Sequence, residues 1–351
     1  MANRETRAVK VGGVIIGGGF PVSVQTMWKE PLAAGEAARA AALRRIGSLK
    51  ELGCDILRFA VPDLASAEAL GELARESPMP LVADIHFDWR IALRCLDYPL
   101  AKIRLNPGNI GARYKVEEVV AKARGKGVPI RIGVNGGSLP EDLRGRPDRA
   151  AAIVEAAERE IAIFDELGFG DVIVSMKSSD AAETLAINRA FASRHGIALH
   201  LGVTEAGPLV QGVARNAAAL VPLLSEGIGE TIRVSLSDSM ENEVLAGREI
   251  LSCAGLGRGG VKLISCPRCG RASFDTHAFT ARWANRLYAL GADATIAVMG
   301  CVVNGPGEGR HADLGITGAG DKVVIFRKGE IARTIRPEEA DTVFEEELNK
   351  L

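Results

Sequence analysis

The 351-residue sequence lacks the features that would place it in a membrane or on a secretory route. No apolar run approaches the roughly 20 residues that a membrane-spanning helix needs. The segment Met1–Arg7 is charged and contains no apolar core of a signal peptide. We therefore expect a cytoplasmic protein that makes no membrane contact.

An excess of charge of one sign is also missing. The 43 Lys and Arg residues are balanced by 44 Asp and Glu residues, which leaves a net charge of -1. Nucleic-acid-binding proteins usually carry a basic excess, so no nucleic-acid partner is expected. Hydrophobic residues make up 47% and charged residues 25% of the chain, as in an ordinary globular protein of more than one domain.

Cysteine is scarce, with six residues in the whole chain. Structural disulfides are rare in cytosolic proteins, so a disulfide framework is not expected. Cys54, Cys95 and Cys253 stand singly, and we interpret them as inert thiols. The other three lie together in the C-terminal part of the chain.

Short β-branched apolar runs alternate with helix-forming stretches along most of the sequence. Such alternation implies parallel strands joined by right-handed crossovers. Eight units within about 250 residues match a (β/α)8 TIM barrel, whereas a doubly wound sheet usually has fewer strands and a dinucleotide motif after the first. The predicted strands are Val22–Thr26, Ile56–Val61, Leu81–Ile85, Lys102–Asn106, Ile130–Asn135, Asp171–Lys177, Leu199–Thr204 and Thr231–Leu236.

A G-x-G-x-x-G pattern at Gly255, Gly257 and Gly260 marks a domain boundary rather than a nucleotide site. It precedes an apolar strand-like run, whereas a dinucleotide loop follows a strand and opens a helix. We therefore expect a barrel over residues 1–254, a glycine-rich linker over 255–260 and a smaller α+β domain over 261–351. The expected elements of that domain are strands at 261–265 and 295–299, a hairpin at 323–335, and helices at 279–290 and 338–351.

Charged and polar residues collect near the carboxyl ends of the predicted barrel strands, where TIM barrels carry their functional groups. The carboxylates, Asp84 and Glu205, are too few to neutralise four arginines and a lysine in positions that alternate with apolar residues. An unpaired buried charge is expensive, and Arg binds phosphate oxygens bidentately. We therefore expect an anionic ligand with more than one charge, most economically a diphosphate. The set comprises Arg58, Asp84, His86, Arg104, Asn106, Arg131, Asn135, Lys177, His200, Glu205 and Arg233.

A second candidate site lies in the smaller domain, where Cys266-Pro-Arg-Cys269 is followed by Cys301 after the next apolar run. Three cysteines exclude a zinc ribbon with four cysteine ligands. A zinc site with three cysteines and His277 or His311 remains open, and a thioredoxin-like dithiol is less favoured.

The third interpretation of these cysteines is a [4Fe-4S] cluster with an unusual fourth ligand. Glu308 ends the segment Cys301-Val-Val-Asn-Gly-Pro-Gly-Glu308 and is the carboxylate placed to reach the fourth iron. A weakly held oxygen ligand could yield that iron to a substrate. Spacing alone favours neither zinc nor the cluster.

Taken together and in order, these motifs resemble one family, the 4-hydroxy-3-methylbut-2-en-1-yl diphosphate synthases, iron-sulfur enzymes of the methylerythritol phosphate route to isoprenoids. The resemblance runs from about Val22 to Gly318, and its most specific part is the string that begins at Gly300. The motifs are Val-Ala-Asp-Ile-His86-Phe, Arg104-Leu-Asn-Pro-Gly-Asn-Ile-Gly111, Arg131-Ile-Gly-Val-Asn135, Gly202-Val-Thr-Glu-Ala-Gly207, Ile232-Arg-Val-Ser-Leu236, Cys266-Pro-Arg-Cys269-Gly and Gly300-Cys-Val-Val-Asn-Gly-Pro-Gly-Glu308.

The resemblance implies a TIM barrel followed by a reductase-like domain, with a [4Fe-4S] cluster on Cys266, Cys269, Cys301 and Glu308. It implies the substrate 2-C-methyl-D-erythritol 2,4-cyclodiphosphate, an external flavodoxin or ferredoxin as electron donor, and a homodimer in which the cluster domain of one subunit caps the barrel of its partner. Trp28 departs from the residue usual in the family, and we expect it to narrow the pocket.

The resemblance leads to a reductive ring opening and dehydration in which Glu205, expected to be buried among polar neighbours, donates a proton. The competing interpretation makes Glu205 a salt-bridge partner of a barrel arginine. Two rival functions remain. One is a pterin- or corrinoid-type transferase barrel with a structural zinc domain, and the other is a zinc-ribbon-like binding module on an inert barrel.

Overall fold

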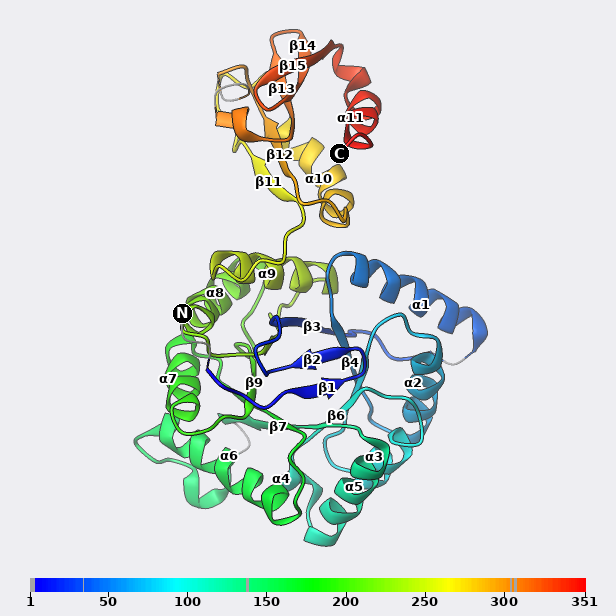
Figure 1. The fold of residues 1–351 in the computed structure, drawn as a ribbon, viewed down its shortest axis with the longest axis vertical. Helices are drawn as coiled ribbons and strands as arrows, with labels where there is room; N and C mark the ends of the chain where they lie inside the picture. Colours follow the sequence, from blue (N-terminus) through cyan, green and yellow to red (C-terminus); the bar gives the residue numbers. More distant parts are fainter. Residues whose placement is uncertain (1–3, 34, 137–138, 304, 306–307) are drawn as a thin grey trace. The chain divides into compact units, whose positions relative to one another are not determined.

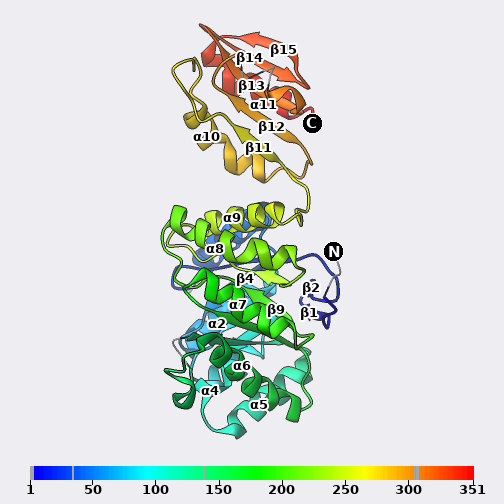
Figure 2. The same cartoon turned by 90° about the vertical axis from the view of Figure 1, so that its left-hand side faces the viewer.

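We analysed a computed structural model of the chain, which describes residues 4–33, 35–136, 139–303, 305 and 308–351. The chain forms two compact units, Met1–Gly257 and Arg258–Leu351, and each is described by itself. Figure 1 gives the element labels, and Figure 2 shows the same ribbon from the side. None of the described helices combines the length and apolar character that crossing a membrane requires.

The first unit is a closed barrel of eight parallel strands in the order β10-β3-β4-β5-β6-β7-β8-β9, as predicted. An outer ring of helices surrounds the strands (Figure 1). The strands are β3 (Ser23–Met27), β4 (Ile56–Ala60), β5 (Leu81–Asp84), β6 (Lys102–Leu105), β7 (Ile130–Asn135), β8 (Val172–Lys177), β9 (Ala198–Leu201) and β10 (Thr231–Ile232). The helices are α1 (Glu36–Glu51), α2 (Leu64–Glu76), α3 (Trp89–Cys95), α4 (Pro107–Ile110), α5 (Arg113–Lys126), α6 (Arg149–Glu166), α7 (Ala181–Ala192), α8 (Leu209–Ser225) and α9 (Met240–Cys253), with a short 3-10 helix η2 (Glu141–Leu143).

Side-chain caps fix the starts of several barrel helices, and so the ends of the loops that follow the strands. A carboxylate, amide or hydroxyl oxygen at the N-cap accepts a hydrogen bond from an otherwise unsatisfied backbone N–H of the first turn. The capping residues are Asp63, Asp88, Asn106, Asp148, Asp180 and Ser239.

An N-terminal hairpin, which the sequence interpretation did not include, closes the bottom of the barrel. Its strands β1 (Val9–Val11) and β2 (Val14–Ile16) are antiparallel. Val9, Val11 and Ile16 pack against residues at the amino ends of the barrel strands, namely Ile56, Val82, Ile173 and Ala198. The hairpin therefore covers the amino ends of these barrel strands with apolar side chains.

The second unit is a five-stranded sheet in the order β11-β12-β13-β14-β15. Strands β11, β12 and β13 are parallel to one another, β14 is antiparallel to β13, and β15 is antiparallel to β14. The strands are β11 (Lys262–Ser265), β12 (Thr295–Met299), β13 (Leu314–Ala319), β14 (Lys322–Arg327) and β15 (Glu330–Ile335); the helices are α10 (Thr276–Tyr288) and α11 (Ala340–Leu348), with 3-10 helices η3 (Glu308–His311) and η4 (Pro337–Glu339).

Both longer helices of this unit pack on the sheet through one aromatic cluster. The rings of Phe279 and Phe344 meet edge to face with centroids 5.0 Å apart, and Trp283 stacks on Phe279 at 5.8 Å. These side chains lie in one buried core with Ile296 and Ile316 of the sheet.

Candidate active site

Asp84, at the end of β5, is shared by two arginines. One carboxylate oxygen lies 3.2 Å from Arg104 Nη1, and the other lies 3.6 Å from Arg58 Nε. Burial alone would raise the pKa of Asp84, but the charges of Arg58 and Arg104 outweigh it and hold the pKa below its usual value. Asp84 therefore stays ionised and supplies one negative charge for two cations.

Arg131 and Lys177 bring further positive charge into the barrel without a carboxylate of their own. Arg131 Nη1 donates to Ser175 Oγ at 3.0 Å, but its Nε and Nη2 have no partner among the described residues. Burial, and then the charges of neighbouring arginines, lower the pKa of both Arg131 and Lys177 well below their ordinary values. Lys177 Nζ lies beside Gly202, where a Cβ atom would come within 2.8 Å of it.

A third carboxylate, Glu243 of α9, pairs with Arg233 and was missed in the sequence. Its two oxygens each lie 3.2 Å from a guanidinium nitrogen of Arg233, and Lys29 Nζ lies 3.0 Å away. Thr26 Oγ1 and the Leu236 N–H also donate to it, at 2.6 and 3.0 Å. Burial would raise the pKa of Glu243, but Arg233 and these hydrogen bonds bring it below its usual value. Glutamates are common on exposed helix faces, so no local sequence signal distinguishes this one.

A layer of fully buried polar side chains lies deeper in the barrel. Thr231 pairs in register with Ser23 on one side and His200 on the other. Lys102 donates to Gln25 Oε1 at 3.4 Å, and both His200 ring nitrogens are without a partner among the described residues. Burial, then nearby cations, lower the pKa of Lys102 and His200 well below their ordinary values.

Two residues of this layer, His200 and Lys102, differ from what the sequence predicted. We predicted that His200 lies at the carboxyl end of its strand, at the barrel mouth. It lies deeper, because Gly202, two residues later, is the residue of this segment that lies beside Lys177 near the mouth. Lys102 was not selected in the sequence, although it alternates with Arg104 in an apolar strand, the same signal that selected the arginines.

The remaining candidates from the strand ends differ in exposure. Asn106 is buried, and its Oδ1 accepts from the Gly108 N–H at 3.1 Å. Asn135 ends β7 in register with Lys177 and is half-buried. His86 is exposed, and its ring centroid lies 6.0 Å from that of the exposed Phe87.

Glu205 does not lie where we expected it. The residue is exposed, not buried among polar neighbours, and its φ of 53° lies in the left-handed region. Within the described part of the chain, no ion pair joins Glu205 to a barrel arginine. The cause is the sharp turn between β9 and α8, which directs the backbone away from the strand axis at this residue.

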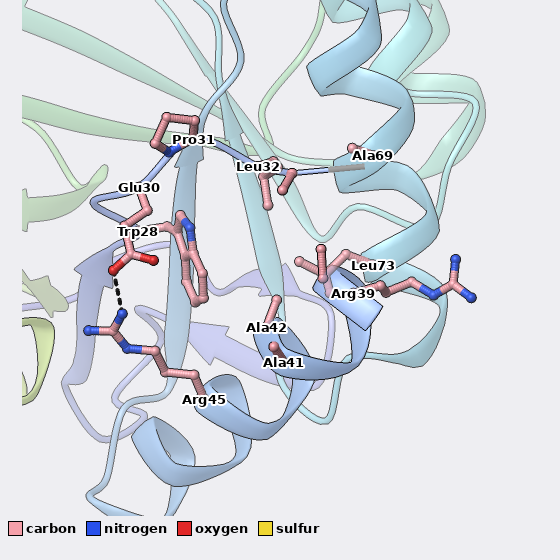
Figure 3. A pocket seen from close by; sticks show the side chains of 12 residues that line it. Trp28, Glu30, Pro31, Leu32, Arg39, Ala41, Ala42, Arg45, Ala69 and Leu73 are labelled. Carbon is pink, nitrogen blue, oxygen red and sulfur yellow. Dashed lines mark hydrogen bonds and ion pairs between the residues drawn. The ribbon is translucent and has the colours of Figure 1, made fainter. Parts of the chain in front are cut away.

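Trp28 does not narrow the barrel opening, contrary to expectation. Its ring stacks on that of Phe59, with the centroids 5.3 Å apart. Phe59 points outward from β4, because its neighbour Arg58 points into the barrel. Figure 3 shows the Trp28 indole on one wall of a separate pocket between the loop after β3 and helices α1 and α2. The pocket has a volume of about 270 Å³, and its lining is mostly apolar but includes Arg39, Arg45 and Glu30. Arg45 pairs with Glu30 at 2.5 Å.

In the second unit, two cysteines lie at the same edge of the sheet. Cys266 directly follows β11, and Cys301 follows the parallel strand β12 after one glycine. Cys266 Sγ lies 3.7 Å from the position that a Cβ of Gly300 would take, and both cysteines are nearly buried. Cys269 is exposed, and no disulfide joins any of the cysteines.

The fourth proposed ligand cannot be located by its side chain. The backbone of Glu308 opens η3, but its side chain lies outside the described part of the chain. Among the described residues, no three His, Cys, Asp or Glu side chains are close enough together to hold a metal ion.

Comparison with known proteins accounts for both units. Residues 6–248 match the GcpE TIM-barrel domain, and residues 262–350 match the GcpE protein C-terminal domain. The chain belongs to the GcpE family. A relative from Treponema pallidum (strain Nichols) is 50% identical over 98% of this chain and 92% of its own length. One from Treponema denticola is 49% identical over 98% of each chain, and one from Thermodesulfovibrio yellowstonii is 45% identical over 99% of each.

All three of these GcpE relatives are named 4-hydroxy-3-methylbut-2-en-1-yl diphosphate synthase (flavodoxin). Among solved structures, the dihydropteroate synthase of Yersinia pestis with a pterine-sulfa conjugate is similar with a TM-score of 0.52, at 12% identity over 71% of this chain and 99% of that one. The Xanthomonas albilineans dihydropteroate synthase gives a TM-score of 0.51 at 13% identity, over 70% and 96%. This likeness concerns the barrel fold alone.

Proposed function

We propose that this chain is a 4-hydroxy-3-methylbut-2-en-1-yl diphosphate synthase that opens the ring of 2-C-methyl-D-erythritol 2,4-cyclodiphosphate by reduction. The observation that carries the proposal is the surplus of buried cations at the barrel mouth. Arg58 and Arg104 share Asp84, whereas Arg131 and Lys177 have no carboxylate of their own. Relatives of that name, which are 49–50% identical over 98% of this chain, support the same conclusion.

The surplus cations would bind the cyclic diphosphate. Arg58, Arg104, Arg131 and Lys177 hold its oxygens, while His86, Asn106 and Asn135 add hydrogen bonds and Arg233 is kept in place by Glu243. Burial and mutual repulsion lower the pKa of Arg58 to about 10, and Asp84 only partly offsets this. A multiply charged anion relieves that repulsion, so ligand charge and site charge stabilise each other.

The reaction balances with two electrons and one proton. The bond between a ring carbon and a diphosphate oxygen breaks, a carbon-carbon double bond forms, and the hydroxyl takes up a proton and leaves as water. The diphosphate gains one negative charge, which appears among the buried arginines. Glu205 would donate the proton. Its exposure in this chain means that bound substrate or a second protein surface must cover it during the reaction.

The cofactor would be a [4Fe-4S] cluster held by Cys266, Cys269, Cys301 and Glu308. The donors fit by chemistry, since the three cysteines, none of which forms a disulfide, and one glutamate lie in the segments that follow β11 and β12. Such a cluster supplies electrons one at a time. Cys266 and Cys301 would anchor it at the sheet edge, and the exposed Cys269 would supply the third thiolate from the loop after β11. The donor of the electrons would be flavodoxin or ferredoxin.

The functional unit would be a cytoplasmic homodimer in which the C-terminal domain of one subunit caps the barrel of its partner. This arrangement would cover Glu205 and exclude water from the mouth. Sedimentation of the purified protein tests it, since a monomer at all working concentrations would contradict the arrangement.

The transferase alternative shares the barrel but needs zinc on the three cysteines and a histidine. Metal and sulfide analysis of anaerobically purified protein separates the two. We expect about four iron and four sulfide per chain with a brown colour. Stoichiometric zinc without sulfide, together with failure of anaerobic reconstitution, would contradict the reductase and favour the transferase.

The proton-donor role has its own test, because Glu205→Gln removes the proton and keeps the shape. We expect turnover to fall by about 100-fold while cluster content is unchanged. Near-wild-type turnover with an intact cluster would contradict the assignment.

A further inference from the structure

Glu160, on α6, is a largely buried carboxylate that the proposed reaction does not use. Its Oε1 accepts a hydrogen bond from the Gly108 N–H at 3.1 Å, and its Oε2 is buried without a partner among the described residues. Burial raises the pKa of Glu160 to about 7, and the bond from Gly108 only partly opposes the shift. Burying a carboxyl group costs free energy, so we looked for the role of Glu160 in the backbone group that it binds.

Gly108 belongs to the turn after β6, which begins with Asn106. Asn106 Oδ1 accepts from the same Gly108 N–H, also at 3.1 Å. One donor thus serves two acceptors, and the turn needs only one of them. A carboxyl oxygen accepts a hydrogen bond whether or not the group is ionised, so Glu160 satisfies this N–H even when the Asn106 side chain rotates away.

The glycine itself is required by this arrangement. A Cβ at Gly108 would lie 2.8 Å from Glu160 Oε1 and 3.4 Å from Asn106 Oδ1. The close approach of both oxygens to the backbone, and not an unusual backbone angle, therefore explains the residue. Helix α6 reaches the turn from outside the barrel, so Glu160 can hold the turn without meeting a ligand in the mouth.

We propose that Glu160 is a positioning residue, which anchors the turn after β6 so that the Asn106 side chain is available to the diphosphate. This inference rests on the proposed function. Asn106 follows Arg104 by two residues at the carboxyl end of β6, and Arg104 already contributes its guanidinium to the mouth. Without Glu160, Asn106 remains committed to capping Gly108 and is lost to the ligand.

The test is a double-mutant cycle on the full-length protein, with inorganic pyrophosphate as the probe and calorimetry as the readout. We expect Asn106→Ala to weaken pyrophosphate binding about tenfold, the value of one hydrogen bond to a charged group. We expect Glu160→Leu to weaken it by a similar factor, and the double variant to be no weaker than Asn106→Ala alone. In turnover, the loss should appear in KM and not in kcat.

Two further variants keep the test decisive. Glu160→Gln retains an acceptor oxygen and should bind pyrophosphate nearly as the wild type does, whereas Glu160→Ala, which adds no apolar bulk, should lose as much as Glu160→Leu. Asp165→Asn, at an exposed position of the same helix, should change nothing.

Additive losses in the cycle, or a Glu160→Gln variant as weak as Glu160→Leu, would overturn the positioning role. Unchanged affinity in Glu160→Leu and Glu160→Ala would overturn it as well. Failure of the wild-type protein to bind pyrophosphate would overturn the diphosphate site and this inference together, so the two failures can be told apart.

Discussion

At the level of single residues, the inward side chains of the barrel trade folding stability for ligand binding. Arg131 is buried with two guanidinium nitrogens unpartnered among the described residues, and Lys102 has a single weak contact with Gln25. Groups of this kind raise the free energy of the folded state, because no counter-charge replaces the water they lose. The same property prepares them for an anion, which restores the missing interactions on binding.

This trade predicts opposite effects of Arg131→Met on stability and binding. We expect the free energy of unfolding to stay the same or to rise by about 1–3 kcal/mol, because a desolvated charge is removed. We expect affinity for the cyclic diphosphate to fall by about 10- to 100-fold. Denaturant unfolding and calorimetry measure the two, with the exposed Arg44→Met as control. Loss of stability with unchanged affinity would show that Arg131 serves the fold.

The raised pKa of Glu160 makes its contribution to stability depend on pH. Between about pH 4.5 and pH 7 the folded protein keeps a proton that the unfolded chain has released, so stability falls as pH rises through this window. Glu160→Gln cannot titrate. Its stability relative to wild type should therefore rise by about 1–3 kcal/mol between about pH 5 and about pH 8.

Denaturant unfolding at the two pH values measures this difference. Glu118→Gln, at an exposed position on α5, is the matched control and should show no pH-dependent difference. A Glu160→Gln difference that is equal at both pH values would mean that the carboxyl titrates normally.

At the level of elements, α9 fastens two loops at the barrel mouth through one carboxylate. Glu243 accepts hydrogen bonds from Thr26 of β3 and from the backbone after β10, and it pairs with Arg233 and Lys29. Glu243 therefore fixes the segments after β3 and after β10 from one position on α9. It also holds the guanidinium of Arg233 bidentately.

Removing this carboxylate should affect both fold and site. We expect Glu243→Ala to lower the free energy of unfolding by about 3–5 kcal/mol, since it leaves the largely buried Arg233 without its carboxylate partner. Glu241→Ala, two residues earlier on the same helix, loses a more exposed pair with Arg45 and should cost less than about 1 kcal/mol. Equal effects of the two substitutions would contradict a special role for Glu243.

Which elements could be predicted depended on how regular the sequence pattern was. The barrel strands are continuous apolar runs, and their alternation with helices was sufficient for the TIM barrel. Strand β13 was missed because Gly315 and Gly318 interrupt it; Gly315 is needed because a Cβ there would overlap the Phe326 ring. The hairpin β1–β2 was missed because its strands have three residues each, although Gly12-Gly13 between them is a turn signal.

The residues of the candidate site were likewise predictable only where a local sequence pattern records their position. Alternation with apolar residues identified the inward charges Arg58, Arg104 and Arg131, whereas Lys102, which shows the same pattern at the start of β6, was not selected. Glu243 was missed because its burial results from tertiary packing of α9, which no local pattern records. The exposure of Glu205 and the outward stacking of Trp28 depend on loop geometry after the strand ends, where periodicity carries no information.

At the level of the whole molecule, the proposed homodimer would join the barrel of one chain to the cluster domain of another. The chain offers a separate variant for each half: Arg131→Met disables the barrel, and Cys301→Ser disables the cluster. At substrate concentrations far below those that the Arg131→Met variant needs for binding, each variant alone should be nearly inactive.

Mixing the two variants, with exchange of subunits, should restore activity if the active site forms between chains. Half of the dimers are then hybrids with one intact site of two, so about a quarter of wild-type activity is expected. No recovery after proven subunit exchange would mean that each chain combines its own barrel with its own cluster domain.

The most direct test of the central claim is the electron stoichiometry of ring opening. Iron-loaded protein is reduced with a measured amount of reduced flavodoxin and mixed with 2-C-methyl-D-erythritol 2,4-cyclodiphosphate under anaerobic conditions. We predict one 4-hydroxy-3-methylbut-2-en-1-yl diphosphate for every two electrons consumed, and none from the Cys301→Ser variant, which would lack the complete cluster. Binding of the cyclic diphosphate without consumption of electrons, in protein that carries a complete cluster, would contradict the account.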